Sequence, residues 1–260
     1  MDVLAGGIAQ RLRAAGCVFA EDEAAVMLET TTDPARLAEL VARRASGAPL
    51  EHVVGWVRFA GLRLAIRPGV FVPRVRTESL VRQALDVTPD HAVVLDLCCG
   101  CGAVGAAIAA ARQGVRVWAS DIDPVAVDNA RENLTAFDAV VAVGDLDEAI
   151  PDGLHGAVHV VVANVPYVPS EQVSFLPTEA REHEPRVSLD GGADGLDVLR
   201  RLAPRVVRWL RPGGAFLTEC ACDQADAAAA VLHGVGLNAL SHKDDELDVA
   251  IVVGRREVDD

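Results

Sequence analysis

The sequence lacks the hydrophobic patterns that mark membrane and secreted proteins. No stretch of about 18 uncharged apolar residues occurs, so no membrane-spanning helix is predicted. The first residues, from Met1 to Gly7, lack the basic segment followed by an apolar one that is typical of a secretion signal. These two absences favour a cytoplasmic protein.

Positive charge is scarce. The chain has 24 Lys and Arg residues against 38 Asp and Glu residues, which gives a formal net charge of −14 at pH 7. Affinity for nucleic acids comes largely from cations that neutralise phosphates, so this balance argues against direct nucleic-acid binding. A local basic patch around Arg74 and Arg76 would still be compatible with this negative net charge.

The cysteines form neither a zinc-binding pattern nor a disulfide framework. A zinc knuckle pair needs two Cys-x2-Cys units, and structural disulfides are uncommon in the cytoplasm. We therefore predict no metal site and expect small apolar residues that fill tight space, with a metal or redox role as the alternative. The six are Cys17, Cys98, Cys99, Cys101, Cys220 and Cys222.

The first 75 residues indicate a helical region followed by a hairpin. With 51% hydrophobic residues, the chain can bury a full α/β core and a small extra domain. Residues 1–48 show helical apolar spacing, and Asp33-Pro34 is typical of a helix start. Residues 52–59 and 62–66 flank Ala60-Gly61, a two-residue turn. We predict a helical domain over 1–48 and a linking hairpin and extended segment over 49–75.

The remaining part, residues 76–260, is predicted to form the catalytic domain. Short apolar runs alternate there with helical segments, which predicts an α/β fold with a mostly parallel sheet covered on both faces. In such a sheet, ligands bind beyond the carboxyl ends of the strands. The predicted strands lie near 92–97, 115–120, 139–143, 157–163, 214–220, 236–241 and 247–253.

Polar residues follow the first three of these strands. The segment 96–102, with Gly100 and Gly102, lets the backbone approach a ligand closely, although nicotinamide or flavin binding, or a plain tight turn, also fits it. Asp121 ends the second strand, where the ribose hydroxyls of a nucleoside would lie. After the third strand, Asp145 could accept a hydrogen bond from an adenine amino group, and Leu146 could pack on the base.

A tetrad, Asn164-Val165-Pro166-Tyr167, follows the fourth strand. The Asn oxygen and a backbone carbonyl can accept the two hydrogens of a planar NH2 group, while the aromatic ring packs on its face. A dehydrogenase explains the glycine turn and Asp121 but not the tetrad, whereas S-adenosylmethionine as cofactor explains all of these features. The tetrad therefore predicts methyl transfer to an amide or amino nitrogen.

Six segments together resemble one known family over nearly the whole chain: 46–55, 72–78, 96–102, 120–124, 164–167 and 184–196. The most specific are Val-Pro-Arg…Thr-Glu in 72–78 and Glu-Pro-Arg…Asp-Gly-Gly…Asp-Gly-Leu in 184–196. With them the chain resembles the release-factor glutamine N5-methyltransferases, the HemK-like proteins. The resemblance implies a class I S-adenosylmethionine-dependent methyltransferase with a Rossmann-like, seven-stranded sheet, a helical amino-terminal domain and a linking hairpin.

The resemblance also implies the substrate and the site. Family members methylate the glutamine of a Gly-Gly-Gln tripeptide in peptide chain release factors, so the expected partner is a protein with an exposed glutamine. The tetrad Asn164, Val165, Pro166 and Tyr167 is expected to be catalytic, and Asn164 also to lie near the transferred methyl. The expected S-adenosyl-L-methionine contacts are Asp96, Cys98, Cys99, Gly100, Cys101, Gly102, Asp121, Ile122, Asp145 and Leu146.

Two departures from the family pattern indicate a divergent paralogue. Val165 stands where the family usually has Pro, and Cys98 stands where it usually has Gly. The carbonyl of Val165 remains available to accept a hydrogen. Two alternatives stay open: an N-methyltransferase that acts on a small-molecule amine or on adenine, and a non-catalytic cofactor-binding module. Thr77 and Glu78 most simply start a helix, with a role in shaping the substrate channel as the alternative.

Overall fold

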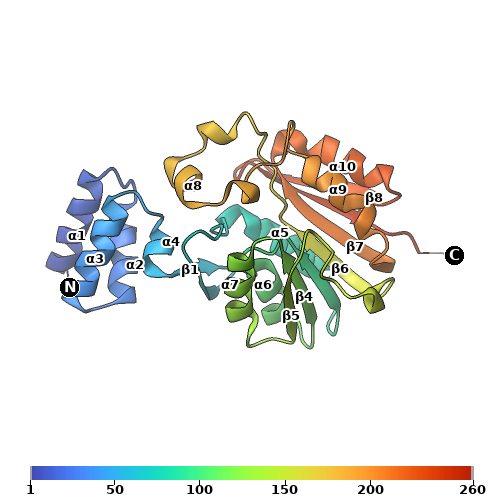
Figure 1. The fold of residues 1–260 in the computed structure, drawn as a ribbon, viewed down its shortest axis with the longest axis horizontal. Coiled ribbons are helices and arrows are strands. Elements are labelled where there is room, and N and C mark those ends of the chain that lie inside the picture. Colours follow the sequence, from blue (N-terminus) through green and yellow to red (C-terminus); the bar gives the residue numbers. More distant parts are fainter. Residues whose placement is uncertain (1, 259–260) are drawn as a thin grey trace.

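The computed structural model describes residues 2–258, and a seven-stranded sheet forms its main body (Figure 1). The strand order is β5-β4-β3-β6-β7-β9-β8. The strands from β3 to β7 pair in parallel, which confirms the predicted mostly parallel, seven-stranded sheet, while β9 is antiparallel to β7 and to β8. The strands are β3 (Val93–Leu97), β4 (Arg116–Asp121), β5 (Ala139–Val143), β6 (Val158–Ala163), β7 (Leu210–Cys220), β8 (Asn238–Asp244) and β9 (Val249–Arg255).

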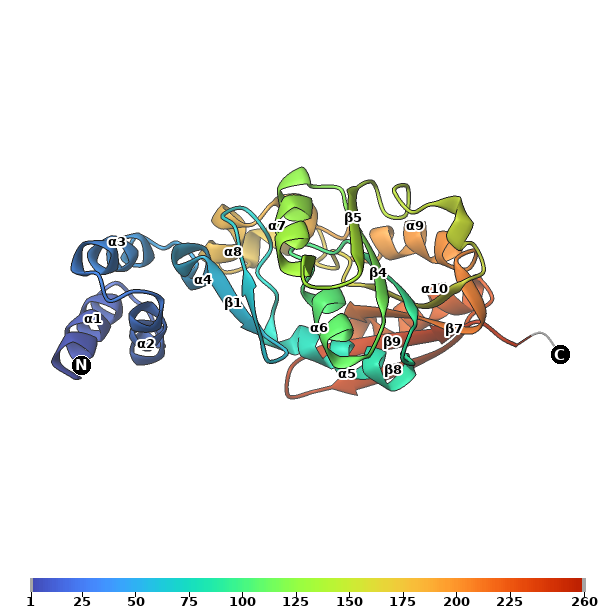
Figure 2. The ribbon, with the colours of Figure 1, turned by 90° about the horizontal axis from the view of Figure 1, so that it is seen from below.

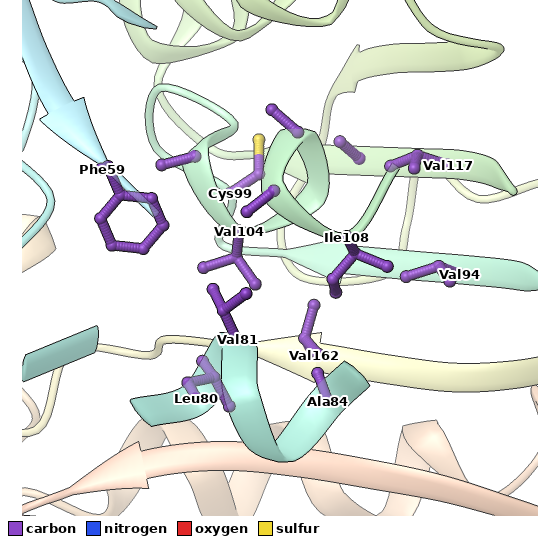
Figure 3. Packing of buried hydrophobic residues seen from close by; sticks show 14 of the residues in the cluster. Phe59, Leu80, Val81, Ala84, Val94, Cys99, Val104, Ile108, Val117 and Val162 are labelled. Atoms are coloured by element: carbon purple, nitrogen blue, oxygen red, sulfur yellow. The ribbon is translucent and has the colours of Figure 1, made fainter. Parts of the chain in front are cut away.

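Helices cover both faces of this sheet because its apolar side chains alternate along each strand. Val94 and Val162 pack with α5, α6 and α7 in one buried cluster (Figure 3), and Val93 and Val161 pack with α9 and α10 in another. The two clusters are the cores of a three-layered α/β fold. The helices are α5 (Glu78–Val87), α6 (Ala103–Ala111), α7 (Pro124–Leu134), α9 (Asp197–Val206) and α10 (Ala225–Gly234).

The strand order reverses beside β3. The chain runs outward from β3 through β4 to β5 and then returns to place β6 on the other side of β3. Ligands of open α/β sheets bind in the crevice that such a reversal leaves at the carboxyl ends of the strands. The loops after β3 and β6, which contain the glycine turn and the tetrad, therefore meet at this crevice.

The amino-terminal helices have a core of their own, built around the fully buried Leu12, Met27 and Leu40. The predicted helix start at Asp33-Pro34 is confirmed: Asp33 accepts a hydrogen bond from the backbone N–H of Arg36 at 2.7 Å. The domain boundaries after residues 48 and 75 stay predictions. The helices are α1 (Asp2–Ala14), α2 (Ala20–Thr30) and α3 (Pro34–Ala45).

The predicted hairpin is present, but its first strand is shorter than expected. Strands β1 (Trp56–Phe59) and β2 (Leu62–Ala65) are antiparallel, and Ala60 and Gly61 form the turn with φ of 48° and 78°. The prediction of a strand from residue 52 was wrong, because Leu50–Val54 form helix α4. Gly55, with φ of 84°, ends that helix before the chain becomes extended.

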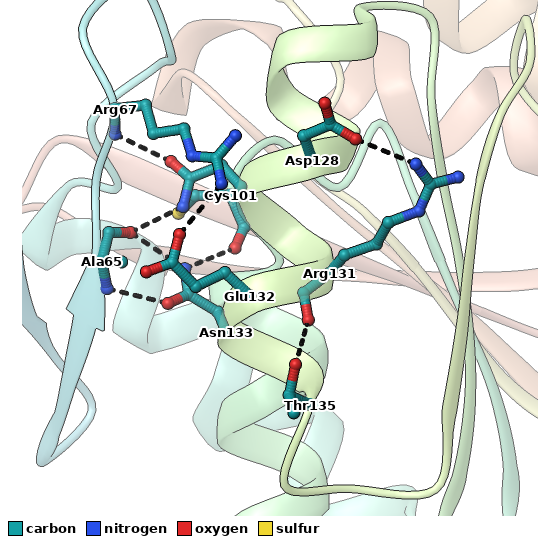
Figure 4. Close-up of polar contacts among 9 residues, drawn as sticks. Ala65, Arg67, Cys101, Asp128, Arg131, Glu132, Asn133 and Thr135 are labelled. Atoms are coloured by element: carbon teal, nitrogen blue, oxygen red, sulfur yellow. Dashed lines mark hydrogen bonds and ion pairs between the residues drawn. The ribbon is translucent and has the colours of Figure 1, made fainter.

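Side-chain amides fix the hairpin to the catalytic domain (Figure 4). The Nδ2 groups of Asn129 and Asn133, both on α7, donate to the carbonyl oxygen of Ala65 at 2.9 Å. The Asn133 Nδ2 group also donates to the Cys101 carbonyl at 2.9 Å, and Asn129 Oδ1 accepts from the Arg67 N–H at 2.9 Å. One amide thus connects the hairpin to the glycine turn after β3.

The long segment between β6 and α9 contains helix α8 (Thr178–His183), which lies beside α4 and the hairpin in both views (Figures 1 and 2). An ion pair of 2.7 Å between Arg44 of α3 and Glu179 joins this segment to the amino-terminal helices. Among the described residues, no helix combines the length and apolarity needed to cross a membrane. Short 3-10 helices cover Val75–Thr77, Asp152–Leu154, Val173–Phe175, Arg186–Ser188 and Cys222–Gln224.

Candidate functional site

A cavity of ≈ 590 Å³ lies at the carboxyl ends of the parallel strands, where the reversal of strand order places a crevice. Its lining falls into two parts. The glycine-loop half is formed by Cys98, Gly100, Asp121, Ile122, Asp145 and Leu146. The tetrad half is formed by Arg74, Arg76, the tetrad 164–167 and residues between 176 and 190. The cavity therefore brings together the tetrad and most of the residues expected to contact the cofactor.

The two glycines of the turn after β3 have different surroundings. A Cβ atom on Gly100, with φ of 55°, would meet nothing within 4 Å, so the backbone there is open to the cavity. A Cβ atom on Gly102 would lie 3.1 Å from atoms of Ala130 and Leu134, so that glycine permits close packing on α7. Cys98 also has a left-handed φ of 55°, a conformation that glycine adopts without strain.

Asp121 ties the ends of two strands together. Its Oδ2 atom accepts the backbone N–H of Gly100 at 2.8 Å, and its Oδ1 atom accepts that of Asp123 at 3.0 Å. Burial raises the pKa of the Asp121 carboxyl, and these two hydrogen bonds oppose that rise. The carboxylate therefore holds the glycine turn while it lines the cavity.

Hydrogen bonds to Ser120 and Trp209 hold the loop after β5 in place. Leu146 has a left-handed φ of 58° and is 4% exposed, and its carbonyl accepts the Ser120 hydroxyl at 2.5 Å. The next residue, Asp147, is buried and accepts from the Trp209 Nε1–H at 2.8 Å. Asp145 forms an ion pair with Arg201 of α9 at the edge of the cavity.

Four of the expected cofactor contacts lie outside the cavity lining: Asp96, Cys99, Cys101 and Gly102. Asp96 is 2% exposed and accepts the Gly105 N–H at 2.8 Å, and burial raises the pKa of its carboxyl to about 7. Cys99 and Cys101 are buried in the apolar cluster shown in Figure 3, and burial raises the pKa of the Cys101 thiol to about 12. These cysteines occupy the positions of small apolar residues.

The tetrad is anchored at both ends. The Asn164 Nδ2 group donates to the Thr77 hydroxyl oxygen at 3.4 Å. The Tyr167 hydroxyl donates to Glu219 Oε1 at 2.8 Å, and the Tyr167 carbonyl accepts from Gln224 Nε2 at 2.8 Å. Burial and the charge of Glu219 raise the pKa of the Tyr167 hydroxyl, so it stays protonated and donates.

The two most specific segments of the sequence pattern contact each other in the tetrad half. The Arg74 Nη2 atom lies 2.8 and 2.7 Å from the two oxygens of Glu184, whose side chain is 1% exposed. The Arg76 Nε atom lies 3.6 Å from Glu219. Both guanidinium groups thus face buried carboxylates, which compensate part of the charge at the basic patch considered for these arginines. Sequence reasoning gave neither Glu184 nor Glu219 a role, because their partners are distant in the chain.

The glycines of the 184–196 segment explain why that segment stays close to the tetrad. A Cβ atom on Gly191 would lie 2.6 Å from the Pro166 carbonyl oxygen, and one on Gly195 would lie 2.1 Å from that of Tyr167. Only glycine allows such an approach of two backbones. The segment therefore forms a wall against the end of the tetrad.

Comparison with known proteins gives one consistent set of relatives. Residues 62–180 match the model of the family described as "Methyltransferase small domain". A release factor glutamine methyltransferase of Mycolicibacterium smegmatis is 39% identical over 80% of this chain and 74% of its own length. Proteins of the same name from Streptomyces coelicolor and Caulobacter vibrioides are 41% and 34% identical, over 73% and 87% of this chain and 69% and 86% of theirs.

Solved structures show the same fold at lower identity. A methyltransferase from Pyrococcus furiosus superposes with a TM-score of 0.57 and 15% identity, over 86% of this chain and 98% of its own. A 16S rRNA methyltransferase from T. thermophilus, solved in complex with AdoMet and guanosine, superposes with a TM-score of 0.55 and 21% identity, over 78% of this chain and 50% of its own. These structures support the class I methyltransferase fold.

Proposed function

The chain belongs to the release factor glutamine methyltransferase family, and on that premise we propose that it methylates the side-chain amide nitrogen of a glutamine in a protein, with a peptide chain release factor as substrate. The methyl donor is S-adenosyl-L-methionine. The observation that carries the proposal is the meeting, in one cavity, of the glycine turn and a tetrad whose Asn164 amide nitrogen is already engaged by Thr77.

The glycine-loop half fits the cofactor. Its carboxylates, Asp121 and Asp145, can accept hydrogen bonds from ribose hydroxyls and an adenine amino group, and the apolar Ile122 and Leu146 can pack against a base. The open backbone at Gly100 leaves room for the methionine portion. When bound, S-adenosyl-L-methionine supplies a methyl group on a positively charged sulfur, which is a strong electrophile.

The tetrad supplies what a glutamine amide needs to react. An amide nitrogen is a poor nucleophile because its lone pair is delocalised into the carbonyl. Asn164 Oδ1 and the Val165 carbonyl oxygen can accept its two hydrogens, which aligns the nitrogen and stabilises positive charge that develops on it. Pro166 restricts the loop, and Tyr167 packs against the amide plane. Since Val165 keeps its carbonyl, the replacement of the usual Pro leaves this function intact.

The proposal is tested with labelled S-adenosyl-L-methionine and matched peptides that contain Gly-Gly-Gln, Gly-Gly-Asn or Gly-Gly-Glu. We expect methyl transfer to the glutamine peptide alone, with the methyl group located on the side-chain nitrogen by fragmentation mass spectrometry. The Asn164→Ala variant is the control and should bind the cofactor but transfer about 100-fold more slowly or worse. Transfer to adenine or to a small amine, but not to glutamine, would overturn the proposal.

A further inference from the structure

Side chains from distant parts of the chain hold the segment 176–190, which lines the tetrad half, at two points. At one point, the buried Glu184 pairs with Arg74. At the other, Glu179 of α8 lies 2.7 Å from Arg44 of α3. Glu179 is among the residues that line the cavity, and Arg44 is not. The contact between Arg44 and Glu179 therefore connects the amino-terminal helices to the tetrad half, and the mechanism above does not use it.

A second carboxylate orients the guanidinium group of Arg44. Its Nε and Nη2 atoms donate to the two oxygens of Glu23, on α2, at 2.7 and 2.9 Å. The side chains of Arg44 and Glu23 are each only 10% exposed. A two-pronged pair of this kind fixes the plane of the guanidinium group as well as its position. The direction of the remaining nitrogen, Nη1, is therefore set within the amino-terminal helices.

This Nη1 atom contacts two further segments. It donates to the Ala48 carbonyl oxygen, two residues before α4, at 3.1 Å, and it lies 2.7 Å from Glu179 Oε1. Because Glu23 already compensates the buried charge of Arg44, the cation does not need a second carboxylate for its own stability. The contact with Glu179 is explained by what it holds in place, the helix α8 that lies beside α4 (Figures 1 and 2).

Helix α8 contributes directly to the lining of the cavity. Glu179 and Ala180 belong to the helix, Leu176 and Pro177 come directly before it, and all four residues line the cavity. The helix has only 6 residues, so it depends on contacts outside itself. A displacement of α8 would move these four side chains together and change the shape of the tetrad half. The glycine-loop half contains no residue of this helix.

We propose that Arg44, acting through Glu179, is a positioning residue that keeps α8 against the tetrad half and thereby sets the affinity for the glutamine substrate. This inference rests on the proposed glutamine methylation. It gives the amino-terminal helices a defined part in the reaction, because a residue of α3 that lies outside the cavity governs how tightly the cavity binds its substrate. Loss of the contact should weaken substrate binding, while the transfer step and the cofactor affinity should change little.

A double-mutant cycle of Arg44→Lys and Glu179→Gln tests the proposal with the Gly-Gly-Gln peptide. Lysine keeps a charge beside Glu23 but lacks the guanidinium fork that reaches two carboxylates, and glutamine keeps the shape of Glu179 without its charge. Each single variant should raise KM about threefold to fivefold, with kcat and the cofactor Kd within about twofold of wild type. The double variant should have the KM of the more affected single variant, because both substitutions remove the same contact.

Three outcomes of this cycle would overturn the proposal. If Glu179 binds the substrate itself, Glu179→Gln would raise KM and Arg44→Lys would not. If the two residues act separately, their effects on KM would multiply in the double variant. If the contact holds nothing that the substrate needs, KM would be unchanged in both single variants. Glu182→Gln, at an exposed position of the same helix, is the matched control and should have the KM of wild type.

Hydrogen exchange, followed by mass spectrometry, tests the hold on α8 without any substrate. The helix ends with the Glu184 N–H, which donates to the Ala180 carbonyl oxygen at 3.1 Å. Fragments that cover residues 176–190 should exchange several-fold faster in Glu179→Gln than in wild type, and Glu182→Gln should match wild type. Glu179 is half-exposed, so this variant gives a result even if Arg44→Lys unfolds the amino-terminal helices. Equal exchange in Glu179→Gln and wild type would contradict the positioning role.

The failure of this inference differs from a failure of the proposed function. A wild-type protein that binds cofactor but does not methylate the glutamine peptide removes the proposed function, and with it the effect on substrate affinity. A wild-type protein that methylates glutamine, together with Arg44→Lys and Glu179→Gln variants of unchanged KM, removes the inference alone.

Discussion

Neighbouring strand ends, linked by short-range contacts, supply the glycine-loop half of the cavity, whereas distant segments of the chain build the tetrad half. The Gly100 N–H and the Asp121 carboxylate that accepts it are 21 residues apart. In the tetrad half, the Asn164–Thr77 and Arg74–Glu184 contacts join residues 87 and 110 positions apart.

The difference indicates how each half can vary. The glycine-loop half depends on backbone conformation, so Cys98 can replace a glycine and still adopt the left-handed φ of 55° that the turn requires. The tetrad half depends on side-chain pairs, and the acidic partners Glu184 and Glu219 are almost completely buried. Loss of one partner in such a pair leaves a buried charge without compensation. Substitutions should therefore affect cofactor binding in the first half and substrate handling in the second.

The largest expected effect concerns Asp96, which lies beneath the glycine-loop half. Its folded-state pKa of about 7 exceeds the ordinary value of 3.8, so the folded protein binds an extra proton between these values, and the associated stability is lost as pH rises through about 7. Between pH 5 and 8 this loss amounts to about 2–3 kcal/mol. Between pH 5 and 8, the free energy of unfolding of Asp96→Asn, measured by chemical denaturation, should therefore fall by about 2–3 kcal/mol less than that of wild type. The cofactor Kd should change little. A large increase in Kd would instead make Asp96 a direct cofactor ligand.

Removal of the Asp121 carboxylate should affect the cofactor itself. Asp121→Ala is expected to weaken cofactor binding by about 1–3 kcal/mol, roughly fivefold to 150-fold in Kd, because buried hydroxyl and N–H groups lose their acceptor. The control is Asp33→Ala: Asp33 caps α3 and is not among the residues that line the cavity, so this variant should lose about 1 kcal/mol of stability and keep the cofactor Kd. Equal Kd values for wild type and Asp121→Ala, measured by calorimetry, would refute the ribose contact.

In the tetrad half, Glu184→Gln should reduce kcat/KM for the glutamine peptide about tenfold, because Arg74 loses a charged partner. Steady-state kinetics should show this effect with an unchanged cofactor Kd. The neighbouring Arg186 forms an exposed pair with Asp190, so Arg186→Gln should stay within about twofold of wild type. A weaker cofactor affinity in Glu184→Gln would show that the two halves are not independent.

The smallest effects are expected at the two glycines. Gly100→Ala should raise the cofactor Kd several-fold. A side chain is disfavoured at the left-handed φ of this position, and the new methyl group would extend toward the cavity. Gly102→Ala should instead lower the free energy of unfolding by about 1–2 kcal/mol, because its methyl group would crowd Ala130 and Leu134. Calorimetry and thermal denaturation of both variants measure the two effects. The reverse pattern would exchange the roles assigned to Gly100 and Gly102.

The sequence was sufficient to predict the sheet, and six of the ten residues that it offered between 96 and 146 as cofactor contacts line the cavity, because both follow from local patterns. Apolar runs located the seven strands, and the residues that follow them occupy neighbouring strand ends. The extent of β1 could not be predicted in the same way. Residues 50–54 are apolar enough for a strand, but Gly55 ends a helical turn there.

The side-chain contacts that hold the tetrad half in place could not be predicted from local patterns. Glu184, Glu219 and Thr77 contact partners that only the fold brings near, and each residue alone has the properties of an ordinary polar residue. The 72–78 and 184–196 segments were noted for their resemblance to the family, yet nothing in their spacing indicated the Arg74–Glu184 contact.

A structure of the protein with the demethylated cofactor product and a Gly-Gly-Gln peptide would show directly whether Asn164 and Val165 hold a glutamine amide. We expect the glutamine side-chain nitrogen to lie within about 3 Å of both Asn164 Oδ1 and the Val165 carbonyl oxygen, with Thr77 on the opposite side of the Asn164 amide. A glutamine side chain bound elsewhere, or an Asn164 amide that presents its NH2 group to the substrate, would contradict it.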